Sequence, residues 1–142
     1  MSELQELIQL IKNQSNENKT VTLGIINEQV AKQILLDSNI DVRNYEITID
    51  IYAVRHIFKN HGNALKEAKR GQFAVQESDF EMIEQVINNP DFVFYDGKNK
   101  IGRDVLQFQK QINNRYIILK EVRTGKKQLS LNSMRIIKNK KS

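Results

Sequence analysis

The sequence predicts an α+β fold with N-terminal helices packed on one face of a four-stranded antiparallel sheet. Apolar residues recur at helical spacing before Pro90, the only proline, and at every second position after it. The period-two segments are joined by short turns, which favours an antiparallel meander. A sheet of this kind buries one apolar face, and the preceding helices are the available cover.

Four helices are expected before Pro90. The first has its apolar stripe at Leu4, Leu7, Ile8 and Ile11, and the polar stretch 13–20 after it is typical of a linker. A short strand at 21–26 precedes Asn27, which can cap a helix with its stripe at Val30, Ala31, Ile34 and Leu35. An extended segment at 45–49 then leads into a helix that contains both histidines. A last helix is expected over 79–88, because Ser78 and Glu81 fit a capping box.

Four strands are expected after Pro90, at 91–95, 105–110, 115–122 and 128–136, with turns at 96–99, 113–114 and 124–126. Alternation places Leu129, Leu131, Ser133 and Arg135 on one side of the last strand, so that an apolar stripe turns polar. On the preceding strand it separates the row Tyr116, Ile118, Lys120 from the row Ile117, Leu119, Glu121, Arg123. Either row can face the helices. In both cases the same end of the sheet collects Lys120 or Glu121, with Arg123, Ser133 and Arg135 near it.

The size of the chain favours one domain. Its 142 residues, 39% of them hydrophobic, can bury one core and are too few for two ordinary domains. We expect a helical arm and linker at 1–19, the main domain at 20–137 and a basic tail at 138–142. The absence of cysteine excludes disulfides and thiol catalysis, and two histidines argue against a zinc site, so no cofactor is expected. No apolar run can cross a bilayer and no signal peptide is recognisable, which favours a cytoplasmic protein that binds no membrane.

Charge is distributed unevenly along the chain. Residues 1–95 hold 9 basic and 14 acidic side chains, whereas residues 96–142 hold 13 basic and 3 acidic ones. A positive field confined to one part of a domain favours a polyanionic partner, RNA or DNA before membrane. The alternative is a solvated surface that ends in a lysine-rich tail.

The two histidines share one short segment, 52–62, and differ in the direction they face. On a helix, Val54, Ile57, Phe58 and His61 form one stripe, while His56 projects from the opposite side. Gly62 stands where a helix commonly ends, which places His61 in the last turn beside unpaired carbonyls. His61 is therefore a candidate acid or base, although such a histidine is more often a hydrogen-bonded packing residue.

These residue types suit cleavage of RNA without a metal. One group takes the proton of the ribose 2′-hydroxyl, another protonates the leaving 5′-oxygen, and cations stabilise the phosphate charge. His61 or His56, Glu121, Ser133 and the basic residues form a sufficient set. Rival chemistries lack support, because the sequence has no phosphate-binding Gly-rich loop, no nucleophile elbow and no carboxylates at metal-ligand spacing.

From about residue 21 to 137 the chain resembles a known family. The resemblance rests on an ordered string of short motifs: Arg55-His56-Ile-Phe-Lys-Asn-His61-Gly62, Glu67 with Arg70-Gly71-Gln72, Ser78-Asp79, Asn89-Pro90-Asp91, Leu119-Lys-Glu121-Val and Leu131-Asn-Ser133-Met134. The family is the phage-associated branch of the nuclease superfamily that includes barnase, RelE and the colicin tRNases, often found in phage polyvalent proteins or fused to head proteins. It implies a barnase- or RelE-like fold and a metal-independent endoribonuclease.

The resemblance also implies roles for single residues. His56 or His61, Glu121 and Ser133 would be site residues, and Arg70 and Lys120 would contact phosphate. Relatives more usually carry threonine where this chain has Ser133, which keeps the hydroxyl without the restricted χ1.

The first hypothesis is therefore a phage or prophage ribonuclease that cuts host RNA, with tRNA as a candidate, and binds phosphate through Arg70, Lys120, Arg123 and Arg135. The second is an inactive nuclease-like module that binds nucleic acid or a phage structural partner, such as a head protein, through its basic half. The third is a toxin fragment neutralised by an acidic immunity or antitoxin protein. Such a protein would act in the host cytoplasm or travel with the virion.

Overall fold

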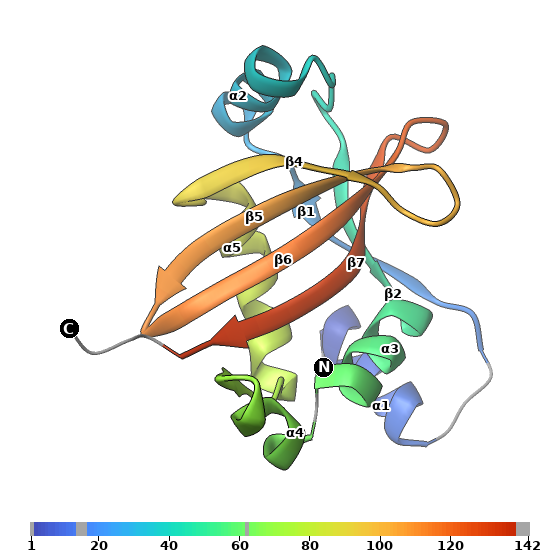
Figure 1. Ribbon diagram of the computed structural model, residues 1–142. Coiled ribbons are helices and arrows are strands. Elements are labelled where there is room, and N and C mark those ends of the chain that lie inside the picture. Colours follow the sequence, from blue (N-terminus) through green and yellow to red (C-terminus); the bar gives the residue numbers. More distant parts are fainter. Residues whose placement is uncertain (1, 14–16, 62, 139–142) are drawn as a thin grey trace.

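The computed structural model describes residues 2–13, 17–61 and 63–138 (Figure 1). Its elements in chain order are α1 (Glu3–Lys12), β1 (Thr20–Ile25), α2 (Glu28–Ser38), β2 (Glu46–Asp50), α3 (Ile51–His61), α4 (Ala64–Lys69), β3 (Gln72–Phe73), the 3₁₀-helix η1 (Glu77–Met82), α5 (Ile83–Asn88), β4 (Phe92–Lys98), β5 (Asp104–Ile112), β6 (Asn114–Arg123) and β7 (Gln128–Ile137). Helices and strands are both present, as expected of an α+β fold.

The sheet is larger than expected. The described residues form seven strands instead of four, in the order β1-β2-β7-β6-β5-β4, and β3 pairs with the end of β7. β4 to β7 make the expected antiparallel meander. β2 was expected only as an extended segment before the histidine helix. It pairs with β7 in parallel, and β1 joins the sheet by pairing with β2. The sequence did not indicate this pairing, because the partners lie about 80 residues apart and a short strand carries little periodicity.

The helices do not form one layer on one face of the sheet, which corrects the second part of the expectation. Figure 1 shows α5 behind β5 and β6. In contrast, α3 contacts β2 and β7, α2 contacts β4, and α1 contacts β1, α3 and η1. The reason is that β1 and β2 extend the sheet past β7, so that α1 and α3 pack against this added part, while α2 packs against β4 at the opposite edge.

The core lies between α5 with η1 and the meander. Its largest fully buried side chains include Phe80 of η1, Phe108 of β5 and Ile118 of β6. The rings of Phe58 and Phe80 meet at a centroid distance of 5.3 Å, which joins α3 to the same core. Leu7, in the segment expected to be an arm, is fully buried there as well.

The N-cap expected from the sequence is present in one helix and absent from another. Asn27 caps α2 as expected, because its side chain accepts a hydrogen bond from the backbone N–H of Gln29. The helix expected at 79–88 starts as a 3₁₀-helix at Glu77, and its first turn is closed by Asp79 accepting from the backbone N–H of Gln76 instead of by Ser78. In the described ranges, no helix is long and apolar enough to cross a membrane.

Candidate active site

A bulge in β7 decides which side chains of this strand face away from α5. Opposite β6, Leu119 pairs with Ser133 but Lys120 pairs with Leu131, which leaves Asn132 as an extra residue. The extra residue turns the following side chains to the other face. Leu129 and Leu131 therefore share the helix-covered face with Lys120, while Ser133 and Arg135 lie on the opposite face. The expectation that all four residues share one side is wrong for this reason.

We call the face of β4 to β7 that is turned away from α5 the open face. The pairing of the strands places on it Phe92, Phe94, Gln107, Gln109, Ile117, Leu119, Glu121, Ser133 and Arg135. The opposite row of β6, with Ile118 and Lys120, faces the helices and is buried. The row of β6 that faces the helices is therefore the one with Ile118 and Lys120, and Glu121 shares the open face with Ser133 and Arg135.

Glu121 is buried and held by three donors. Arg103 Nη1 donates to its Oε1 at 2.6 Å, Arg123 Nε to the same oxygen at 2.8 Å, and Asn99 Nδ2 to Oε2 at 2.7 Å. Burial raises the pKa of the Glu121 carboxyl, but the hydrogen bonds from Arg123 and Arg103 outweigh it and hold the pKa below its usual 4.5. A carboxylate held in this way is a poor proton carrier near neutral pH and a good anchor for guanidinium groups.

Lys120 points into the protein. Its side chain is 0% exposed, and its Nζ donates to the backbone carbonyl of Thr48 at 2.6 Å. Burial lowers the pKa of Lys120 well below 10.5, against the opposite effect of the Asp50 carboxylate. The pairing of β2 with β7 ends at Thr48 and Ser130, so this lysine holds β2 where the two strands part. In this structure Lys120 is enclosed and is not presented to a substrate.

His61 contacts a buried carboxylate. As expected, Val54 and Ile57 are buried on the same stripe of α3, and His56 is exposed on the other side. The Nδ1 atom of His61 lies 3.3 Å from Oε2 of Glu67, which is 0% exposed. Gly62, expected to end this helix, lies outside the described residues. A histidine whose Nδ1 faces a carboxylate has a fixed ring orientation and keeps Nε2 for proton exchange.

The other oxygen of Glu67 binds an arginine. Arg70 Nη1 donates to Oε1 at 3.1 Å and to the backbone carbonyl of Asn60 at 3.3 Å, while half of its side chain stays exposed. Asn63 caps α4 by accepting from the backbone N–H groups of Leu65 and Lys66, which sets the short helix that carries Glu67. His61 and Arg70, both predicted site residues, thus meet through a third residue.

The position of His61 relative to the sheet follows from the backbone. The N–H of Val75 donates to the carbonyl of His61 at 2.7 Å, and Phe73, two residues earlier, pairs with Ile136 of β7. His61 therefore lies toward the end of β7 that carries Arg135. Between described residues, no hydrogen bond or ion pair joins His61 to Glu121, Ser133 or Arg135, and the ring nitrogens of His56 contact only Asn60.

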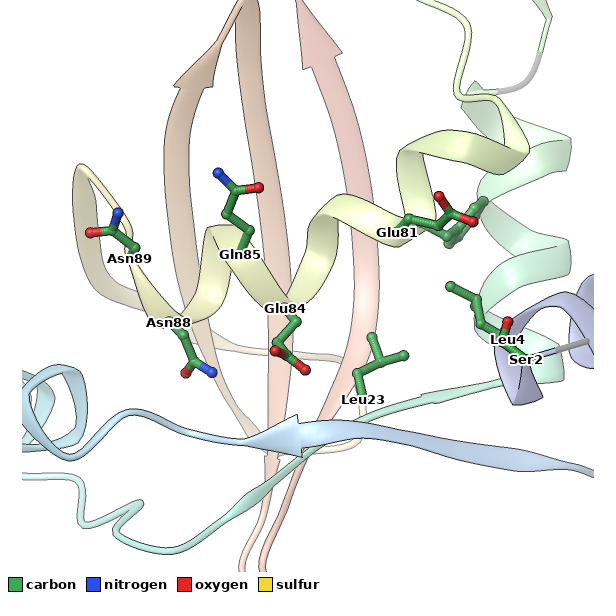
Figure 2. Close-up of a pocket in the computed structure, with 9 residues that line it drawn as sticks. Ser2, Leu4, Leu23, Glu81, Glu84, Gln85, Asn88 and Asn89 are labelled. Atoms are coloured by element: carbon green, nitrogen blue, oxygen red, sulfur yellow. The ribbon is translucent and has the colours of Figure 1, made fainter.

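A groove of about 630 Å³ between α1, α5 and β1 is separate from these residues. It is lined by Ser2, Leu4, Leu23, Phe80, Glu81, Glu84, Gln85, Asn88 and Asn89. Figure 2 shows the Glu84 side chain directed toward β1. The carboxylates of Glu81 and Glu84 would repel a phosphate, so this groove does not suit the anionic partner that the charge distribution predicts.

Two parts of the candidate site were not predicted as such. Glu67 was noted only within the family motif, although a carboxylate one turn into the helix after a histidine is a signal for a His–carboxylate pair. Arg103 and Asn99 lie in the turn between β4 and β5 and carried no periodic signal. Their convergence on Glu121 comes from the pairing of β5 with β6.

Comparison of the sequence with models of protein families finds a matching family. The family model described as phage-Barnase-EndoU-ColicinE5/D-RelE like nuclease3 matches residues 20–142. The chain belongs to this family. The resemblance drawn from the sequence motifs is thereby confirmed, and α1 precedes the matched region. The comparisons with curated proteins and with solved structures found no match.

Proposed function

We propose that this nuclease-family protein is a metal-independent endoribonuclease of phage or prophage origin that cleaves host RNA, with tRNA as a candidate substrate. The ribose 2′-hydroxyl attacks the adjacent phosphorus and the 5′-oxygen leaves, which gives a 2′,3′-cyclic phosphate and a 5′-hydroxyl end. His61 exchanges a proton with the reacting oxygens through Nε2. Ser133, Arg135 and the exposed part of Arg70 bind phosphate.

One observation supports this proposal above the others: His61 is hydrogen-bonded to a fully buried carboxylate at the end of β7 that carries Arg135. A carboxylate in this position stabilises the imidazolium that forms when Nε2 takes a proton. The proposal gives Glu121 a structural role in place of the acid–base role expected from the sequence. Held as an anion by Arg103 and Arg123, it positions these guanidinium groups instead of carrying the proton.

The test uses end-labelled RNA in the presence of EDTA. His61→Ala is expected to lower kcat about 100- to 10,000-fold, the usual contribution of a general acid or base. Glu67→Gln is expected to lower kcat more than about 10-fold with KM unchanged, because the ring loses the carboxylate that orients it. His56→Ala should cost less than about 10-fold, and Lys66→Ala, an exposed neighbour of Glu67, serves as the matched control. Wild-type protein that yields no more 2′,3′-cyclic ends than His61→Ala rules out the proposal.

One observation favours the second candidate, a nuclease-like module that binds nucleic acid without cutting it. The expected proton partner of His61, Glu121, is neutralised by two arginines. For such a module we expect salt-sensitive binding without turnover. Substitutions of basic residues after position 96 should abolish binding, whereas His61→Ala should leave it unchanged. In that case the same protein samples show no cleavage but retain RNA affinity.

A further inference from the structure

Two exposed aromatic rings stand on the open face at the edge of the sheet. Phe92 and Phe94 of β4 are 59% and 43% exposed. They alternate with Val93, which is buried on the helix-covered face, so both rings point to the face without α5. Exposure of two phenylalanines at positions i and i+2 leaves ring faces that neither core packing nor a covering helix uses.

The pairing of the strands connects these rings to the predicted phosphate-binding residues. Across the sheet, Phe94 lies in one row with Gln107, Leu119 and Ser133, and Phe92 lies in the next row with Gln109, Ile117 and Arg135. Three strand spacings separate β4 from β7, which is about 14 Å. A strand of nucleic acid that reaches from β4 to β7 must therefore extend over more than one nucleotide.

Between β4 and β7 the open face carries a hydrogen-bonded polar chain on β5 and the apolar side chains Ile117 and Leu119 on β6. Arg115 Nη1 donates to Oε1 of Gln109 at 3.2 Å, Gln109 Nε2 to Oε1 of Gln107 at 2.6 Å, and Gln107 Nε2 to Asp96 at 3.2 Å. Rings on β4, amides on β5 and a guanidinium with a hydroxyl on β7 match the parts of a single strand, which has base faces, base edges and phosphates. The positive charge of residues 96–142 agrees with an anionic occupant.

We propose that the open face binds unpaired RNA, with bases stacked on Phe92 and Phe94 and the neighbouring phosphates toward Arg135. This inference rests on the proposed function for its choice of RNA, and it adds that the substrate presents at least two unpaired nucleotides beside the cleaved bond. A duplex keeps its bases stacked inside and cannot use the rings.

The experiment measures binding without cleavage. A six-nucleotide 2′-O-methyl RNA, which cannot form a cyclic phosphate, carries 2-aminopurine at one position, and the same sequence annealed to its complement is the duplex probe. Phe92→Ala and Phe94→Ala are each expected to weaken single-strand binding about 5- to 100-fold and to remove the 2-aminopurine stacking signal. Phe92→Tyr and Phe94→Tyr should keep both. Ile101→Ala and Leu65→Ala, which remove exposed apolar side chains elsewhere, are the matched controls.

The dependence on salt separates stacking from charge. Arg135→Ala should lower the slope of log Kd against log salt by about 0.7, while the phenylalanine variants leave the slope unchanged. If the double variant Phe92→Ala/Phe94→Ala binds the single-stranded probe as tightly as the wild type, the proposal is overturned, and a protein partner becomes the better explanation of the exposed rings. Equal loss of duplex and single-strand affinity would overturn it too. Neither result depends on turnover, so failure of the proposed function would appear separately, as intact binding without cleavage.

Discussion

At the scale of single residues, the neighbours of a charged group decide its chemistry. Glu121 and Glu67 are both buried carboxylates, yet Glu121 is bonded to Arg103, Arg123 and Asn99, whereas Glu67 is shared between His61 and Arg70. The first arrangement fixes a carboxylate as an anion, and the second orients an imidazole. The sequence pointed to Glu121 as the proton carrier, but its contacts suit an anchor better.

Replacing Glu121 tests its charge state. Its pKa in the folded protein is below the usual 4.5, so its contribution to stability is complete above about pH 4.5 and is lost as the pH falls through the folded pKa. Between pH 5 and pH 3, the wild-type protein should lose more free energy of unfolding than Glu121→Gln. Urea unfolding at several pH values measures this difference. Parallel curves for the two proteins would mean that Glu121 is not held as an anion.

At the scale of elements, the bulge in β7 is the feature that assembles the open face. If the strand alternated regularly through Asn132, with no bulge, Leu131 and Ser133 would share one side, and either the apolar or the polar half of the strand would face the wrong way. Bulges re-aim side chains beside functional sites in many sheets. Here the change of face lets one strand contribute first to the core and then to the proposed RNA surface.

Deleting Asn132 tests the bulge. The deletion makes β7 a regular strand, in which Leu129, Leu131, Met134 and Ile136 all stay on the helix-covered face. We therefore expect a small change in the free energy of unfolding. Deleting Ser130 instead makes Leu129 and Leu131 adjacent, so that one of them leaves the core at a cost of about 1.5–3 kcal/mol. Asn132→Ala, which keeps the extra residue, should also change the stability little. Chemical denaturation of these variants makes the comparison, and a loss for the Asn132 deletion as large as that for the Ser130 deletion would contradict the assigned register.

At the scale of the whole molecule, α1 belongs to the core although it lies outside the family match. Leu4, Leu7 and Ile8 are buried in the cluster that also holds Phe80. Lys12 forms an ion pair with Glu77 at 2.6 Å, and α1 contacts α3, the helix that carries His61. The helix α1, which lies in the segment expected to form an arm, thus packs against the element that carries the candidate catalytic histidine.

Leu7→Ala measures how much α1 contributes. Because this side chain is fully buried, its truncation should lower the free energy of unfolding by about 2–5 kcal/mol. Gln9→Ala, on the exposed side of the same helix, should change it by less than about 0.5 kcal/mol. Thermal or urea unfolding distinguishes the two variants. An effect of Leu7→Ala as small as that of Gln9→Ala would show that α1 is detached in solution.

Local pattern was enough for some elements and not for others. The four strands after Pro90, the inward direction of His61 and the Asn27 cap follow from periodicity and capping, which depend on near neighbours in the chain. The pairing of β2 with β7 and the two-residue strand β3 depend on contacts between distant segments, and no local pattern encodes them. The one-layer arrangement of helices failed for the same reason, because it assumed a sheet without β1 and β2.

By itself the sequence determined the class of fold, the family and the residue types available for chemistry, because periodicity, charge and motifs are properties of the chain. Only the tertiary structure decided that Ser133 and Arg135 share a face with Glu121, that Lys120 is buried, and that Glu67 is hydrogen-bonded to His61. These three facts depend on a bulge, on the parting of two strands and on the packing of a short helix. Each is set by backbone geometry and distant contacts, which the order of residues along one strand or helix does not specify.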